Sequence, residues 1–260
     1  MDYREHAPPP ALRPFVTCFW TLDARGEPYR VLPDGAMDIL FSRGESSAKV
    51  IGPMTKALVV DDAGETVFAG ARFRPGAALE MLGVAARELR DESATLDDVW
   101  GADGRTLSAR LAGALDADEM VRFLRDELAL RALRVRAPDP RVARAVALLD
   151  ANGGELPVPA VAERAGLGER QLERLFDERV GYGPKAFARV VRMRRATHAI
   201  ARGTTASWAR LAVECGYADQ AHLVREFRAL TGVTPRIYAA EARMSEIDNP
   251  ERTGIRSLEE

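Results

Sequence analysis

A short pattern of residues occurs twice in the C-terminal part of this chain. The first copy is Ala162, Gly166, Leu172, Arg174, Phe176, Gly181, Pro184 and Phe187. The second copy is Ala212, Gly216, Leu223, Arg225, Phe227, Gly232, Pro235 and Tyr238. The offset is 50 residues for the first two positions and 51 for the rest, so one residue has been added between the glycine and the leucine of the second copy. A duplicated unit of this size suggests two similar contacts with a partner that itself repeats, and duplex DNA is the obvious candidate.

Each copy predicts two short helices joined by a tight turn. In the first copy a helix begins near Pro159, because proline is tolerated only in the first turn of a helix. Gly166 ends it, since glycine readily adopts the left-handed conformation of a sharp turn. A second helix from about Glu169 buries Leu172 and Phe176 at positions i and i+4. This arrangement is a helix-turn-helix.

The second copy repeats these features at a distance that suits DNA. A helix over Trp208–Cys215 comes first, and Asp219 is a good cap for the next helix. Both copies continue with Gly-x-x-Pro, so that new helices begin at Pro184 and Pro235. Between the copies, residues 184–202 predict one helix of about 28 Å. That length is close to the roughly 34 Å between successive major grooves on one face of the duplex.

A helix-turn-helix contacts DNA through the exposed face of its second helix. The expected base-contacting residues are Arg170, Gln171, Glu173 and Arg174 in the first unit, and Gln220, Ala221, Val224 and Arg225 in the second. Arginine suits the two acceptors of guanine, and glutamine suits adenine. The helices that begin at the two prolines present backbone N–H groups that could hold phosphates, and Lys185, Arg189 and Arg236 lie near them. The alternative, that such arginines are ordinary solvated surface residues, is weakened by the two matching copies.

These residues resemble the AraC/XylS family of bacterial transcription regulators. The matching stretches are VAERAGLGERQLERLFDERVGYGPKAFARVVRMRRA and LAVECGYADQAHLVREFRALTGVTPRIYA, and the resemblance covers about residues 140–242. It implies a seven-helix DNA-binding domain that inserts two helix-turn-helix units into neighbouring major grooves. By position, it places Arg170, Glu173 and Arg174 where the family contacts bases with its first unit. It places Gln220, Ala221 and Arg225 where the family does so with its second.

The first unit departs from the family pattern. Gly168 stands where such proteins usually have a serine that caps the recognition helix, and Pro159 is unusual at the start of the preceding helix. The first recognition helix is also acidic, which opposes the approach of phosphates, because it carries Glu169, Glu173, Asp177 and Glu178. A glutamate can still accept a hydrogen bond from cytosine. The second unit is therefore expected to contribute more of the affinity.

Charge and length divide the chain into two domains and a tail. The net charge of the chain is −2, but the charges are unevenly distributed. Residues 138–243 contain 17 Lys and Arg and 12 Asp and Glu. Residues 1–137 contain 18 basic and 22 acidic residues, and residues 244–260 contain 2 basic and 5 acidic residues. The basic surplus thus lies in the part expected to bind DNA. We expect a sensor or dimerisation domain over 1–137, a DNA-binding domain over 138–243, and a disordered tail over 244–260.

Residues 1–137 predict a mixed β and α domain. Short runs that are typical of a small antiparallel sheet or barrel span Phe15–Leu22, Tyr29–Leu32, Met37–Phe41, Lys49–Ile51, Ala57–Val60 and Thr66–Phe73. Helical spacing follows over Ala77–Leu82, Arg105–Leu115 and Asp118–Arg134. LPDGAMDILF and GARFRPGAA resemble the N-terminal domain of one group of AraC-type regulators, which implies sensing or oligomerisation, with a cupin-like barrel as one candidate fold. The expected fold class is α+β, a mixed domain followed by an all-α seven-helix domain.

The N-terminal region lacks an evident catalytic or metal site. Its one histidine, His6, lies in a flexible-looking proline-rich arm, whereas a metal-dependent cupin needs converging histidines and carboxylates. The aromatic residues are expected to form core, with an apolar ligand pocket as the alternative; they are Phe15, Phe19, Trp20, Phe41, Phe68 and Phe73. Arg72 and Arg74 point away from Phe73 on a regular strand, where they either bind an anionic ligand or face solvent. No catalysis, cofactor or metal is expected.

The sequence as a whole predicts a cytoplasmic bacterial transcription regulator. No apolar run is long enough to span a membrane, and the N-terminus lacks the apolar core of a signal peptide. Double-stranded DNA is the expected partner, and RNA polymerase, a small-molecule effector and a second copy of the chain are further candidates. The rival interpretation is a DNA-targeted alkylation-repair or cysteine-based sensor protein that uses Cys18. A helical module that binds protein rather than DNA is the weakest interpretation.

Overall fold

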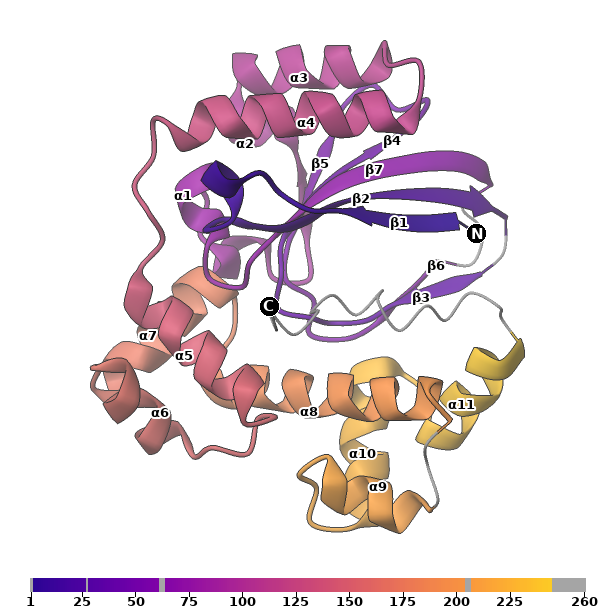
Figure 1. Cartoon of the computed structure of the whole chain (residues 1–260), viewed down its shortest axis with the longest axis vertical. Helices are drawn as coiled ribbons and strands as arrows, with labels where there is room; N and C mark the ends of the chain where they lie inside the picture. Colours follow the sequence, from indigo (N-terminus) through magenta and orange to yellow (C-terminus); the bar gives the residue numbers. More distant parts are fainter. Residues whose placement is uncertain (1, 27, 61–63, 204–206, 245–260) are drawn as a thin grey trace.

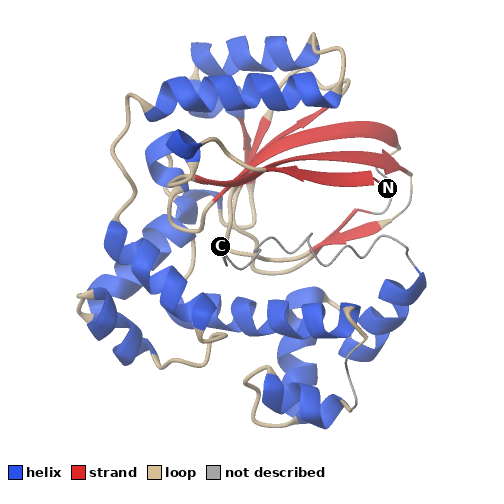
Figure 2. Ribbon diagram, in the orientation of Figure 1, coloured by secondary structure: helices blue, strands red, loops and turns tan. Residues whose placement is uncertain are grey.

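The computed structural model describes residues 2–26, 28–60, 64–203 and 207–244 (Figure 1). A sheet-rich N-terminal domain is followed by a helical C-terminal domain, so the fold class is α+β as expected (Figure 2). The predicted disordered tail falls, from residue 245 on, outside the described residues.

The N-terminal domain contains two antiparallel sheets. The six-stranded sheet has the order β1-β2-β7-β4-β5-β8, with the bounds Asp2–His6, Val16–Arg25, Glu65–Phe73, Asp38–Ser42, Lys49–Ile51 and Ser93–Thr95. A second sheet pairs β3 (Tyr29–Val31) with β6 (Leu58–Val60). The short 3-10 helices η1 (Pro10–Leu12) and η2 (Ala86–Leu89) lie in the connections.

Helices cover one face of the six-stranded sheet (Figure 2). They are α1 (Ala78–Leu82), α2 (Leu96–Trp100), α3 (Ala102–Ala112) and α4 (Ala117–Ala132). Side chains alternate between the faces of a strand, so the predicted aromatic set divides between them. Phe15, Phe19, Phe41 and Phe73 join the core beneath the helices. Trp20 and Phe68 lie on the opposite face with Cys18 and Leu22.

Several parts of the N-terminal domain differ from expectation, including the unpredicted strand β8. His6 does not lie in a flexible arm, because residues 2–6 form β1 and pair with β2 from Asp2↔Asp23 to His6↔Phe19. This edge strand is held by backbone hydrogen bonds and has little hydrophobic alternation to reveal it. Helix α2 was not expected either, since five residues show no clear period; Thr95 caps it by accepting a hydrogen bond from the Asp98 amide.

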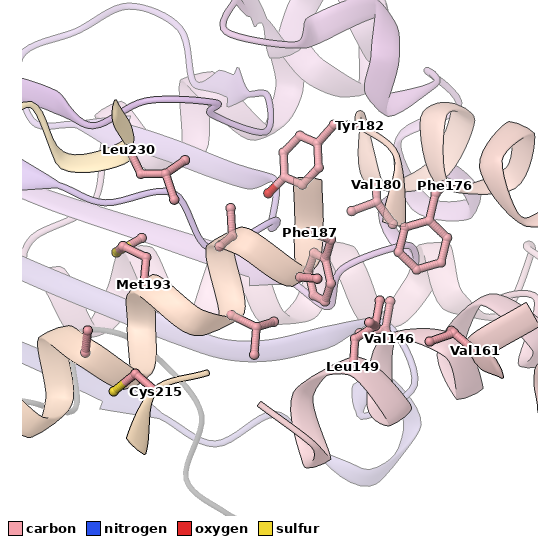
Figure 3. Packing of buried hydrophobic residues seen from close by; sticks show 14 of the residues in the cluster. Val146, Leu149, Val161, Phe176, Val180, Tyr182, Phe187, Met193, Cys215 and Leu230 are labelled. Carbon is pink, nitrogen blue, oxygen red and sulfur yellow. The ribbon is translucent and has the colours of Figure 1, made fainter. Parts of the chain in front are cut away.

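The C-terminal domain contains seven helices in the described residues, as expected. They are α5 (Pro140–Ala151), α6 (Val158–Ala165), α7 (Glu169–Val180), α8 (Pro184–Ala201), α9 (Trp208–Glu214), α10 (Gln220–Thr231) and α11 (Pro235–Met244). Their buried side chains form one core, part of which Figure 3 shows. Phe176 meets Phe187 edge-on, with ring centroids 6.0 Å apart, and the equivalent Phe227 and Tyr238 meet edge-on at 5.5 Å. The two copies of the sequence pattern therefore make the same internal contact.

Candidate nucleic-acid interface

The turns of the two helix-turn-helix units have the same construction. Gly166 and Gly216 follow α6 and α9 with φ of 71° and 77°, the left-handed region that favours glycine. In each unit the next amide donates to the carbonyl of the repeated alanine, Ala162 or Ala212, at 2.9 Å. The extra residue of the second copy lies in the turn before the cap, so Leu172 and Leu223 are both the fourth residue of their recognition helix.

The recognition helices α7 and α10 differ at their N-termini. Asp219 caps α10, since its side chain accepts a hydrogen bond from the His222 amide at 2.7 Å. Gly168 occupies the same place before α7 and offers no side-chain hydrogen bond. A side-chain cap stabilises a helix by a few tenths of a kcal/mol relative to glycine at the same position. The first unit therefore begins with a weaker helix end.

The expected base-contacting residues lie largely on exposed surface. Arg170, Glu173 and Arg174 are exposed on α7, and Gln220, Ala221 and Arg225 are exposed on α10. Gln171 and Val224 are partly buried. Among the described residues, Arg174 and Arg225 have no ion-pair partner, although other arginines of this domain are paired. Their guanidinium groups are therefore available to a ligand.

The residues expected near phosphates divide into two groups. Lys185 and Arg236 are exposed at the second position of α8 and α11. Arg189 is instead engaged within the protein, because its Nε lies 2.8 Å from Oε1 of Glu226 on α10. The structure thus brings Lys185 and Arg236 to equivalent helix starts but does not leave Arg189 free.

Glu226 joins α10 to α8 and was not anticipated from the sequence. Its carboxylate contacts Arg189, Arg192 at 3.2 Å and His222 at 3.7 Å. Burial acts to raise its pKa, but the hydrogen bond from Arg192 and the charges of both arginines hold the pKa of Glu226 below its usual range. One glutamate among the alternating charges of a helix gives no sequence signal for such a contact.

An acidic side chain lies beside the start of α8. A Cβ atom built at Gly183, the residue before Pro184, would lie 2.5 Å from Oε2 of Glu173. The carboxylate is therefore adjacent to the backbone N–H groups that were expected to hold a phosphate. Its negative charge competes with phosphate at this helix start.

The arginines on either side of Phe73 contact other residues of the N-terminal domain. Arg72 neither faces solvent nor stands free for an anion, because Asp34 at 3.4 Å and Asp38 at 3.3 Å surround its Nε. Trp20 Nε1 donates to Asp38 Oδ1 at 2.8 Å, which completes the cluster. Arg74 Nε donates to the Arg13 carbonyl at 2.6 Å. The enclosed cluster of Arg72 is therefore part of the fold, whereas the contact of Arg74 lies at the surface.

Cys18 has the environment of a structural thiol. The side chain is buried, and burial raises the pKa of the Cys18 thiol well above its usual range despite the nearby charge of Arg72. A protonated thiol is a poor nucleophile. Within the described residues no group of three or more His, Cys, Asp or Glu side chains could hold a metal ion. No described helix is long and apolar enough to cross a membrane.

Comparison with known proteins identifies two regions of the chain. Residues 4–95 match a domain of unknown function (DUF6597), and residues 161–241 match a helix-turn-helix domain. The HTH-type transcriptional regulator ArgR of Pseudomonas aeruginosa is 28% identical over 148 residues, which are 55% of this chain and 45% of ArgR. The chain therefore spans less than half the length of this curated relative.

Solved structures of similar proteins cover either part or most of this chain. A transcriptional regulator from Chromobacterium violaceum with an AraC-type DNA-binding domain is 31% identical, with 40% of this chain and 92% of that chain covered, at a TM-score of 0.38. Apo ToxT from Vibrio cholerae is 10% identical over 85% of this chain and 97% of its own, at a TM-score of 0.47. The sequence match to the Chromobacterium protein and the helix-turn-helix match together show that the chain belongs to the AraC-type family of transcriptional regulators.

Proposed function

We propose that this protein binds a specific two-part DNA site, with α7 and α10 in adjacent major grooves. The observation that carries the proposal is the state of Arg174 and Arg225. They occupy equivalent places in the two copies and are exposed, and neither has an ion-pair partner among the described residues. By contrast, Arg192 and Arg195 on α8 are held by carboxylates. An unpaired arginine on a recognition helix is suited to the two acceptors of guanine.

The length of α8 supports contact with two grooves. Its 18 residues join the two units as one helix, which spans about 27 Å at 1.5 Å per residue. Lys185 and Arg236 at the starts of α8 and α11 are exposed and suited to phosphate contacts on either side. Residues 138–243 would form this DNA-binding domain.

Residues 1–137 would sense an effector or mediate self-association in the cytoplasm. No observation favours the rival function in alkylation repair, because the Cys18 thiol is buried and held protonated. RNA polymerase remains a candidate partner, to be tested by transcription assays with the purified polymerase.

Selection of bound sequences from a random duplex library with the full chain tests the proposal. We expect an enriched motif with two half-sites about ten base pairs apart. Arg225→Ala should cost about 1–3 kcal/mol and relax the preference at one base pair. Arg144→Ala, which removes an exposed arginine of α5, is the matched control. Equal weakening on all sequences would show that Arg225 contacts phosphate, and no enrichment at any salt concentration would refute the proposed function.

A further inference from the structure

An arginine of the N-terminal domain holds the end of the first recognition helix. Arg90 follows η2, and its Nε donates to the carbonyl of Gly181 at the C-terminus of α7. Its Nη2 also pairs with Asp177 in the last turns of the same helix. A cation beside the last carbonyls of a helix is favourable, because the C-terminus carries a partial negative charge.

Two further contacts fix this end of α7. Arg179 forms an ion pair with Glu80 of α1, in which the side chains are only 17% and 11% exposed. The turn after α7 also lies directly against the N-terminal domain, since a Cβ atom at Gly181 would come within 2.2 Å of Pro53 Cγ. The C-terminus of α7 is therefore attached by both charge and packing.

A second arginine of the N-terminal domain holds the end of the other recognition helix. Arg30 of β3 donates from Nη1 to the Thr231 carbonyl at 2.9 Å, and its Nη2 lies 3.5 Å from Glu241 of α11. The backbone amide of Ala57, beside β6, donates to the Leu230 carbonyl at 2.7 Å. Residues in and beside the two-stranded sheet thus form hydrogen bonds with the last turn of α10.

The two arginines contact nearly equivalent positions in the two copies of the sequence pattern. Gly181 and Gly232 are equivalent, and the carbonyls that the arginines hold belong to Gly181 and to the residue before Gly232. We infer that Arg90 and Arg30 are positioning residues, through which the N-terminal domain sets the separation and relative angle of the two recognition helices and so the half-site spacing that the protein accepts. This inference rests on the proposed function.

Small changes in the angle between the two helix-turn-helix units would otherwise change that spacing. A turn of about 10° at one end of a helix of about 27 Å displaces the other end by about 5 Å. Successive base pairs are about 3.4 Å apart. One base pair also turns the second half-site by about 34° about the duplex axis, because a helical turn takes about 10.5 base pairs. A site lengthened or shortened by one base pair therefore requires both a shift and a rotation of one unit relative to the other, and units held at both ends resist these movements.

The attachments leave the expected DNA-contacting faces open. Arg90 and Arg30 reach the recognition helices at their C-terminal ends, and Arg30 also contacts Glu241 of α11. Arg170 and Arg174 on α7, and Arg225 on α10, stay exposed while these contacts are made. These contacts therefore position the recognition helices without covering the expected DNA-binding surface.

The second attachment is also connected to the interior of the N-terminal domain. Arg30 and Tyr29 are neighbours on β3, so their side chains point to opposite sides. Tyr29 packs against the cluster of Cys18, Trp20 and Leu22 on the six-stranded sheet. A displacement of that cluster would move Arg30 relative to Arg90, and with it α10 relative to α7.

Spacing preference in the full chain tests the inference. The variants are Arg90→Ala, Arg30→Ala and the double variant, with Arg87→Ala and Arg25→Ala as controls that remove exposed arginines nearby. Each is titrated with duplexes that carry the selected half-sites at the preferred spacing and at one base pair more or less. Arg90→Lys and Arg30→Lys keep the charge but cannot make both contacts at once, so they should restore the preference only in part.

The wild type should bind the preferred spacing at least about tenfold more tightly than its neighbours. In the double variant this ratio should fall toward one, while the base preference within each half-site is unchanged. An unchanged ratio would overturn the inference. Hydrogen exchange without DNA gives an independent check: amides in the turns after α7 and α10 should exchange faster in the double variant than in the controls, and equal rates would also overturn it. If the wild type selects no two-part site at all, the proposed function fails instead, and the exchange experiment still decides whether the attachments hold.

Discussion

The uncapped start of α7 leads to a prediction about stability. Gly168 has φ −77° and ψ 152°, an extended conformation that any residue adopts, and a Cβ atom there would meet nothing within 4 Å. A serine at this position can accept a hydrogen bond from a free amide of the first turn, as Asp219 does for α10. We therefore expect Gly168→Ser to stabilise the helical domain.

The magnitude follows from two contributions. Replacing a glycine whose conformation is unstrained stabilises by about 0.4–1 kcal/mol, because the unfolded chain loses freedom. A serine cap adds a few tenths of a kcal/mol over glycine. The free energy of unfolding should thus rise by about 0.5–1.5 kcal/mol. Gly168→Ala should lie about 1 kcal/mol below Gly168→Ser, since alanine is a poor cap.

Gly166 provides a matched control two residues away. A Cβ atom there also meets nothing within 4 Å, but φ is 71°. Gly166→Ser should therefore destabilise by about 1–2 kcal/mol through backbone strain alone. Urea unfolding of the full chain, followed by the helical signal, measures all three variants. Equal stabilities for the two serine variants would refute the argument that backbone conformation and capping decide the outcome here.

Three further predictions concern charge and the buried thiol. Glu173→Gln should strengthen DNA binding severalfold, because it removes a negative charge beside the start of α8. Titrations at two salt concentrations should show that this gain becomes smaller at the higher salt concentration. An unchanged affinity would mean that no phosphate approaches this site. The pKa of Glu226 is lowered in the folded state, so its contribution to stability is complete above the unfolded-state pKa and is lost as the pH falls through the folded-state pKa. Glu226→Gln should therefore flatten the acid side of the curve of unfolding free energy against pH. An unaltered curve would contradict this prediction. Cys18 should resist thiol reagents at neutral pH until the protein unfolds, as followed by mass spectrometry, and rapid selective modification of the native protein would revive the sensor interpretation.

Local sequence features were enough to predict the helical domain. Proline at helix starts and glycine at helix ends have fixed backbone causes, so the bounds of α7 and α8 differ little from expectation. The turn that contains the extra residue of the second copy follows from the same reasoning, because one residue before Asp219 lengthens the turn without changing the buried face. In the N-terminal domain, β1 escaped detection because its stability comes from pairing with β2 rather than from its own side chains.

Contacts between distant segments could not be predicted in this way. Arg30 and Thr231 are 201 residues apart in sequence, and Arg90 and Gly181 are 91 apart. Each arginine sits among other charged residues and has no spacing that distinguishes it from a solvated side chain. Arg72 shows the same limit, since its two aspartate partners come from a neighbouring strand and a loop.

The two helix-turn-helix units have similar buried contacts but differ in the contacts at the ends of their recognition helices. A weaker contact at one end of a helix is accompanied by a stronger one at the other. Both bury an edge-on aromatic pair, so the geometry of each unit is set by the same packing. The first recognition helix lacks a side-chain cap at its N-terminus but is held at its C-terminus by Arg90 and by the ion pair of Arg179. The second has the Asp219 cap and is held by fewer charged contacts. The order of α7 therefore depends more on the N-terminal domain than that of α10 does, and any signal that loosens the domain contact should act first on the first unit.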